Sequence, residues 1–237
     1  MMNILSKSAV LTGLVTLLLA LPAHGSINKS IKVGAGEASD GESSVNGSIT
    51  IGEGATITGD VTTVNGTIRI EQGATVGDAE TVNGGLRVAD NVVSENLSTV
   101  NGSIRVADQV SVSGEISAVN GRIVVGGGSK IANDVGNVNG EIELSGSEVG
   151  GDLTTVNGDI ELADGAVIRG DLIVEKPGGW NNSRREPRIV IGPGSRVEGK
   201  IRLEHEVELF ISESAEVGGV EGVMSMGDAV RFSGKKP

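Results

Sequence analysis

Short apolar-polar-apolar triplets recur along this chain, and each follows the tripeptide Val-Asn-Gly at a fixed distance. The tripeptide occurs seven times, at spacings of 18 or 19 residues. A near-constant period of this length is typical of a solenoid, in which each repeat forms one turn and packs only on its neighbours. The asparagines of the series are Asn46, Asn65, Asn83, Asn101, Asn120, Asn139 and Asn157.

Within one repeat the aliphatic residues fall at fixed offsets. The triplet Ile68-Arg69-Ile70 has the period of two that marks a strand with one buried face. No helical stripe appears after residue 25. The sequence therefore predicts an all-β, single-domain parallel β-helix of about ten coils of 18–19 residues, ~45–50 Å long at ~4.8 Å per coil.

The handedness of the coil is open from the spacing alone. Val64, Ile70, Val76 and Val82 lie six residues apart, as in the left-handed hexapeptide helices of acyltransferases and gamma-class carbonic anhydrases. Half of the intervals in the Val-Asn-Gly series contain 19 residues, however, which departs from a strict multiple of six. A right-handed coil is favoured over a left-handed one.

The Asn-Gly pairs are expected at a tight corner of each coil. Both residues tolerate positive φ, which such a corner often requires. Asn side chains stacked at one level can hydrogen-bond to one another along the axis and satisfy polar groups turned toward the interior. We therefore interpret the seven asparagines as a structural corner ladder rather than as a ligand groove.

The first 25 residues are typical of a secretory signal peptide. Lys7 precedes an apolar stretch, and the triplet Ala23-His24-Gly25 suits cleavage after Gly25. The remaining segments are a lead-in and first coil (26–44), the Val-Asn-Gly repeats (45–175), an inserted loop (176–187), C-terminal coils (188–223), and a terminal strand and tail (224–237). We expect export to the periplasm or cell surface, with no stable membrane span after signal removal.

The inserted loop interrupts the repeat, and its composition differs from that of the coils. It contains the only tryptophan, Trp180, and the arginine pair Arg184 and Arg185. Such a loop is the expected contact for an envelope or surface partner. A tolerated insertion whose Trp180 packs on the adjacent coil is the alternative.

Composition excludes several classes of function. The chain lacks cysteine and has only His24 and His205, so thiolate chemistry and His-rich metal sites drop out. Its net charge of −12, from 19 basic and 31 acidic residues, disfavours a nucleic-acid partner. His205 is more simply a solvated corner residue than a general base. We expect no enzymatic activity, no catalytic residues and no cofactor.

Two charged columns run along the predicted coils. The first precedes the late-coil aliphatic residue and gives an acidic edge, either a solubilising surface or a weak site for calcium. The second changes sign along the rod, from Arg69, Arg87 and Arg105 to Glu143 and Glu161. The carboxylates of the acidic edge are Asp60, Asp78, Glu115, Asp134, Asp152 and Asp171.

Two segments resemble the repeat of bactofilins, the bacterial polymer-forming cytoskeletal proteins. They are 189–201 (IVIGPGSRVEGKI) and 51–61 (IGEGATITGDV), and the resemblance extends over about residues 45–223. It implies a right-handed β-helix that assembles into filaments without nucleotide. We expect an exported, non-enzymatic structural or scaffold protein that self-associates end to end. An adhesin-like surface or glycan-binding module is the alternative.

Overall fold

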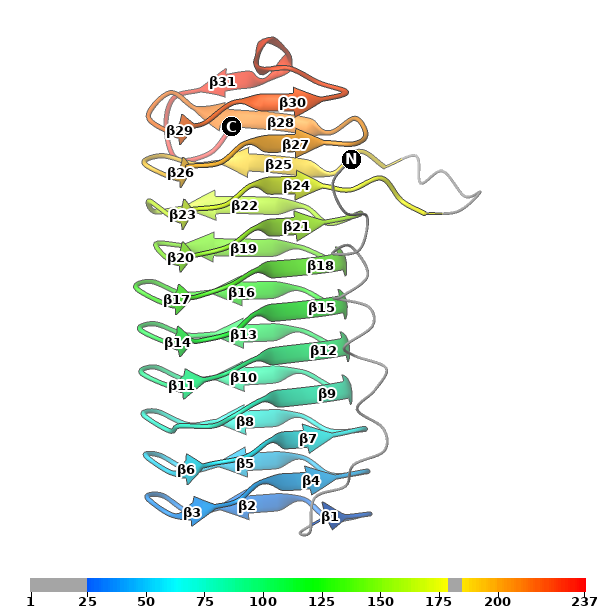
Figure 1. Ribbon diagram of the computed structural model, residues 1–237, viewed down its shortest axis with the longest axis vertical. Coiled ribbons are helices and arrows are strands. Elements are labelled where there is room, and N and C mark those ends of the chain that lie inside the picture. Colours follow the sequence, from blue (N-terminus) through cyan, green and yellow to red (C-terminus); the bar gives the residue numbers. More distant parts are fainter. Residues whose placement is uncertain (1–24, 179–184) are drawn as a thin grey trace, which may run out of the picture.

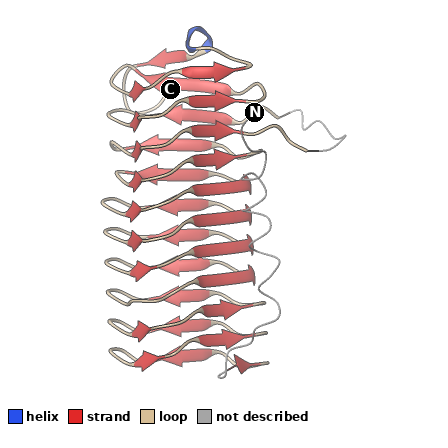
Figure 2. Cartoon of the chain, in the orientation of Figure 1, coloured by secondary structure: helices blue, strands red, loops and turns tan. Residues whose placement is uncertain are grey.

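The computed structural model describes residues 25–178 and 185–237 and shows one parallel β-solenoid (Figure 1). About ten coils, each about 19 residues long, stack along the rod axis. All strand pairs between coils are parallel, and the one helical element among the described residues is a short 3-10 turn, η2 (Met226–Asp228) (Figure 2). The all-β, parallel β-helix prediction is confirmed, while the preference for a right-handed coil stays a prediction.

Sheet A contains the strands that lead into the Val-Asn-Gly corner. It has 11 strands in the described part of the chain, each in register with its equivalent one coil away. In chain order they are β1 (Gly25–Ser26), β4 (Glu42–Ser44), β7 (Val61–Thr63), β9 (Ala79–Asn83), β12 (Leu97–Asn101), β15 (Ile116–Asn120), β18 (Val135–Asn139), β21 (Leu153–Thr155), β24 (Leu172–Val174), β27 (Ile201–Leu203) and β30 (Val220–Gly222).

Sheet B follows the corner and contains the apolar-polar-apolar triplets. It also has 11 strands, which point opposite to those of sheet A in Figure 1. They are β2 (Ile31–Val33), β5 (Ile49–Ile51), β8 (Ile68–Ile70), β10 (Leu86–Val88), β13 (Ile104–Val106), β16 (Ile123–Val125), β19 (Ile142–Ser145), β22 (Ile160–Ala163), β25 (Arg188–Ile191), β28 (Glu208–Ser212) and β31 (Val230–Phe232).

Sheet C closes each coil with two-residue strands. Seven of them pair continuously: β11 (Val93–Ser94), β14 (Ser111–Val112), β17 (Lys130–Ile131), β20 (Glu148–Val149), β23 (Val167–Ile168), β26 (Arg196–Val197) and β29 (Glu216–Val217). Near the N-terminal end, β3 (Ala38–Ser39) and β6 (Thr56–Ile57) pair separately, and single bridges at Thr75 join them to the row.

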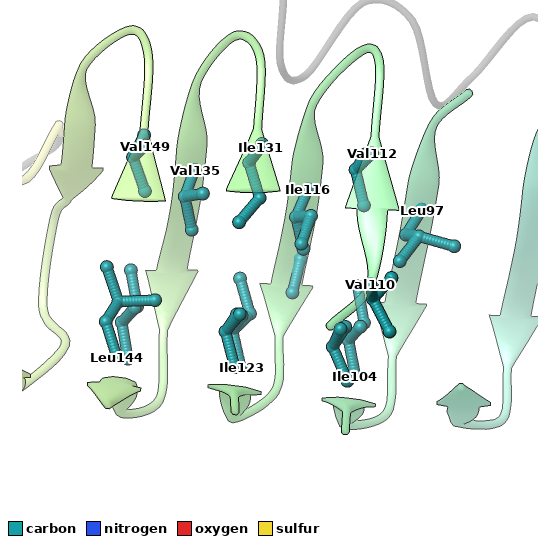
Figure 3. Packing of buried hydrophobic residues seen from close by; sticks show 14 of the residues in the cluster. Leu97, Ile104, Val110, Val112, Ile116, Ile123, Ile131, Val135, Leu144 and Val149 are labelled. Carbon is teal, nitrogen blue, oxygen red and sulfur yellow. The ribbon is translucent and has the colours of Figure 1, made fainter. Parts of the chain in front are cut away.

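The core is a set of aliphatic columns that run the length of the rod. Because the strands pair in register, each inward side chain packs on its equivalent in the next coil, as Ile104 does between Leu86 and Ile123 (Figure 3). These three side chains are fully buried. Full burial of a Leu or Ile side chain contributes ~1.5–3 kcal/mol, before the entropy of ordering the chain is subtracted.

The valines of the Val-Asn-Gly series are not core residues, although they recur at the same fixed offset as the other aliphatic residues. Val64, Val82 and their equivalents are half-buried on the outside of the corner, whereas the preceding residue, such as Thr63, is fully buried. The reason is strand alternation: Val61 points inward, so Thr63 points inward two residues later and Val64 points outward.

The backbone turns with positive φ also differ from the expectation. Most of them follow the strands of sheet B, whereas within the Val-Asn-Gly series only Gly140 has positive φ. At seven coils a glycine adopts this conformation, while Asn91 and Gln109 adopt it with φ of 59°. The left-handed region disfavours side chains, so this turn is where the repeat requires glycine for conformational freedom.

One inward position breaks an aliphatic column and gives a prediction. Ser94 is buried, its hydroxyl has no hydrogen-bond partner, and the equivalent residues of the next coils are Val112 and Ile131. Ser94→Val removes a buried unpaired hydroxyl and adds apolar contacts. It should raise the free energy of unfolding by about 1–2 kcal/mol in urea denaturation.

Ser94→Ala is the matched control, because it removes the hydroxyl without filling the column. It should give part of the gain. A Ser94→Val variant less stable than the parent would contradict the assigned inward register.

Candidate functional site: the polar columns of the rod

The asparagines of the Val-Asn-Gly corner form one continuous hydrogen-bonded column. Each side-chain Nδ2 donates to Oδ1 of the asparagine one coil earlier, at 2.8–3.1 Å. The column begins at Asn28, which accepts from Asn46 at 2.8 Å. Most of these side chains are exposed, so the ladder lies on the outside of the corner and not toward the interior as we expected.

The glycine of each Val-Asn-Gly is required by close approach of two backbones. A Cβ on Gly84, Gly102 or Gly121 would overlap the carbonyl oxygen of the equivalent glycine one coil earlier. Within this series only Gly140 has φ in the left-handed region. Glycine therefore serves the corner by leaving space for the neighbouring coil.

A second polar column lies inside the corner. The hydroxyls of Thr63, Thr81 and Thr99 donate to the carbonyl oxygens of the Val-Asn-Gly glycines one coil earlier, at 2.8–3.0 Å. These threonines are buried. The hydroxyl column therefore satisfies the main chain and offers no surface to a ligand.

The predicted acidic edge also binds the main chain. Oδ1 of Asp134 accepts the backbone N–H of Asp152 at 2.7 Å, and Oδ1 of Asp152 accepts that of Asp171 at 2.8 Å. Asn96 takes the same role in its coil and accepts the N–H of Glu115 at 2.9 Å. Each of these side chains thus caps the next coil at a turn where the strand ladder is interrupted.

Sequence analysis missed the same device at a second turn. Oδ1 of Asp90 accepts the N–H of Asp108 at 3.0 Å, and Oδ1 of Asp108 accepts the N–H of Gly127 at 2.7 Å. The signal was present in the sequence as aspartates at one offset in consecutive repeats. It was not used, because the residue type alone does not tell a backbone cap from a solvated charge.

Stacking carboxylates at this edge has an electrostatic cost. Burial, with the nearby charges of Asp78 and Asp60, raises the pKa of Glu80 to about 7. Burial, with Asp134 and Asp78, also raises the pKa of Glu115. The ionised forms of Glu80 and Glu115 are therefore disfavoured by burial and by repulsion from the nearby aspartates.

The arrangement of the carboxylates decides whether a metal ion has a ready-made site. In residues 25–178 and 185–237, no group of three or more His, Cys, Asp or Glu side chains is placed to hold a metal ion. The oxygens of Asp134 and Asp152 that face along the column already accept main-chain hydrogen bonds. Calcium binding by the edge stays a prediction without a preformed site.

His205 has a structural contact where the inserted loop leaves the rod. Its Nε2 lies 3.2 Å from the carbonyl oxygen of Val156. In the preceding coils the equivalent carbonyl accepts the N–H of the next asparagine, as Val138 accepts that of Asn157. His205 thus contacts the Val156 carbonyl, at the place where a regular coil has the N–H of the next asparagine.

The inserted loop joins β24 to β25 on the side of the Asn corner (Figure 1). Trp180 and Arg184 lie outside the described residues. Arg185 forms an ion pair with Asp159, and the same carboxylate accepts the N–H of Arg188 at 2.8 Å. Asp159 therefore fixes the C-terminal base of the loop to the rod.

The fold and columns define the class of protein as a parallel β-helix repeat protein. Comparison with protein-family models, curated proteins and solved structures gives no match. In the part of the chain that the structure describes, no helix is long and apolar enough to cross a membrane.

The acidic column predicts a difference between two substitutions at one position. Asp152→Ala leaves the N–H of Asp171 without its acceptor and should lower the free energy of unfolding by about 0.5–1.5 kcal/mol. Asp152→Asn keeps an Oδ1 acceptor, as Asn96 does, and removes one like charge. It should be at least as stable as the parent in urea denaturation; equal losses for both variants would contradict the capping role.

The raised pKa of Glu80 predicts a pH dependence. Its carboxyl binds a proton more tightly in the folded chain than in the unfolded chain, where the pKa is near 4.5. The folded state is therefore penalised as pH rises from about 4.5 through about 7. Glu80→Gln should raise the melting temperature at pH 8 and have little effect at pH 4. A gain of the same size at both values would contradict this assignment.

Proposed function

We propose that the mature chain is an exported, non-enzymatic structural protein that assembles end to end into longer rods. The observation that carries the proposal is that sheets A and B run the whole length of the described rod and finish in edge strands at both ends. Unpaired strand edges are templates for further strands. Head-to-tail contact would continue the parallel stacking from β30 and β31 of one copy into β1 and β2 of the next.

The N-terminal end has exposed and partly buried apolar side chains. Ile27 is 68% exposed, and Ile31 in β2 is only partly buried. Cleavage after Gly25 would leave Ser26 in β1 as the first residue of the mature rod. This end thus offers both a main-chain edge and apolar side chains.

The C-terminal end is apolar but partly covered. Val223 and Val230 are 58% and 53% exposed, while Met224 and Met226 around η2 pack against the last part of the core. Arg231 pairs in register with the inward Ile211, and its guanidinium donates to the carbonyl of Ser212 at 3.4 Å. A charged side chain at this position makes β31 less favourable for pairing with a further strand. We therefore expect a reversible end contact.

The non-enzymatic part of the proposal rests on how the polar groups are used. Asparagines, threonines and aspartates each repeat at one level per coil and bind the neighbouring coil. Catalysis needs different groups converging on one reacting atom. Rows of identical groups that bind one another or the main chain of the next coil suit a mechanical role.

The resemblance of 51–61 and 189–201 to bactofilin repeats supports polymer formation without nucleotide. Export, to the periplasm or cell surface, is supported by the pattern of residues 1–25. An adhesin-like surface or glycan-binding module is the second candidate. The inserted loop favours this second candidate, because it interrupts the repeat and is tied to the rod through Asp159.

Two matched substitutions test the end contact. Ile27→Asp and Val223→Asp each place a charge on an exposed apolar residue, at opposite ends of the rod, and should leave the coils folded. Purified residues 26–237 should form concentration-dependent chains in electron microscopy and light scattering. Either substitution should reduce these chains to short rods, because head-to-tail contact uses both ends.

The outcomes separate the alternatives. If only one substitution acts, the contact joins two identical ends and the head-to-tail geometry is wrong. If the parent chain stays a single short rod at every concentration, the scaffold proposal fails and the adhesin-like candidate moves ahead. Circular dichroism of each variant checks that the β-solenoid is intact.

A further inference from the structure

We propose that two copies of this chain also associate side by side, antiparallel, through the outer face of sheet B. The inference is independent of the end-to-end contact, because it uses a different surface. It rests on the charge pattern of one column of outward side chains, which is complementary to itself when the rod is inverted.

The register of sheet B places these side chains one above another. The middle residues of consecutive strands are Arg69, Arg87, Arg105, Val124, Glu143 and Glu161. Three positive levels are thus followed by one neutral level and two negative levels, each one strand spacing of ~4.8 Å apart.

The arginine half of the column has no partner among the residues that the structure describes. Arg69, Arg87 and Arg105 are exposed, and none forms a hydrogen bond or ion pair with a described residue. Like charges directly across a ladder are destabilising. Thr50 and Val124, at the flanking levels, are neutral residues in the same position. Three adjacent arginines therefore indicate an anionic partner surface rather than a requirement of the fold.

A second copy supplies a matching surface. A two-fold axis that lies in the interface, parallel to β16 and at the level of Val124, places Val124 of one chain against Val124 of the other. It places Arg105 opposite Glu143 of the second chain and Arg87 opposite Glu161, and the same two pairs form again by symmetry. Parallel rods would instead put arginine against arginine, so the charges select the antiparallel arrangement.

The surroundings of the column suit contact with a flat partner. Gly85 and Ser103 precede the arginine triplets of β10 and β13, and Ala89 and Ala107 follow them. Around Arg87 and Arg105, therefore, no large side chain directly precedes or follows the triplet. The guanidinium groups can therefore reach a facing carboxylate.

The acidic half already has contacts within the chain, and they would compete with a second copy. Arg122 pairs with both Glu141 and Glu143, and Lys236 in the tail pairs with Glu161 at 2.8 Å. Arg122 can remain near Glu143 in the dimer. Lys236, by contrast, occupies the level that Arg87 of the second copy would take, so releasing the tail should strengthen association.

Ionic strength should affect the dimer in two directions. The net charge of −12 for the full chain makes two copies repel at low salt. At about 0.15 M salt, charges farther apart than ~8 Å are screened while pairs in contact are not. Association should therefore be strongest at intermediate ionic strength and weaken again at high salt.

A charge-swap experiment tests the interface. It is done on residues 26–237 carrying Ile27→Asp and Val223→Asp, so that end-to-end assembly does not contribute. Sedimentation equilibrium should show a dimer in this background. Arg87→Glu with Arg105→Glu should weaken it by at least about tenfold, because four exposed ion pairs are lost. Glu143→Arg with Glu161→Arg should do the same.

Mixing the two charge-reversed proteins should restore a heterodimer, and the chain with all four swaps should again form a homodimer. Lys130→Glu, on sheet C, is the control and should have no effect. Lys236→Gln should tighten the dimer. A parent that stays monomeric at intermediate salt, or a dimer that survives both reversals, overturns the proposal, whatever the result of the end-to-end test.

Discussion

The structure depends on in-register hydrogen bonding between the main chains of consecutive coils. A coil with three short strands buries too few side chains to be stable alone, and each gains its partners only by stacking. Register brings equivalent residues together at every level: Ile104 packs on Ile123, and Asn101 donates to Asn83. Any feature that repeats in the sequence therefore becomes a column along the rod.

This constraint explains which residue types occupy the columns. A column position must suit its own copy above and below, which favours aliphatic residues inside and self-complementary amides outside. Asparagine meets this requirement because its side chain both donates and accepts. Aspartate does not pair with itself, and the structure uses it by directing one oxygen to the main chain of the next coil, as at Asp134 and Asp152. Burial, and after it repulsion from Asp78 and Asp60, raises the pKa of the neighbouring Glu80.

Much of this could be predicted from the sequence, because repetition is itself the signal. The coil length, the triplets of sheet B and the stacking of the asparagines follow from spacing alone. The outward direction of the asparagines did not, because the alternation that places Thr63 inward and Val64 outward stops at the corner, where Asn65 is exposed as well. Contacts between distant residues, such as Lys236 with Glu161, have no periodic signal and were not predicted.

The polar columns bind neighbouring coils of the rod, through side chains or the main chain, rather than a ligand. Hydrogen exchange of the purified chain, followed by mass spectrometry, tests this most directly. The backbone amides of Asp152 and Asp171 donate to aspartate side chains of the acidic column, at 2.7 and 2.8 Å. They should exchange as slowly as the strands of sheets A and B in the central coils. Exchange of these amides at the rate of an unfolded peptide would contradict this role and leave the column free for binding.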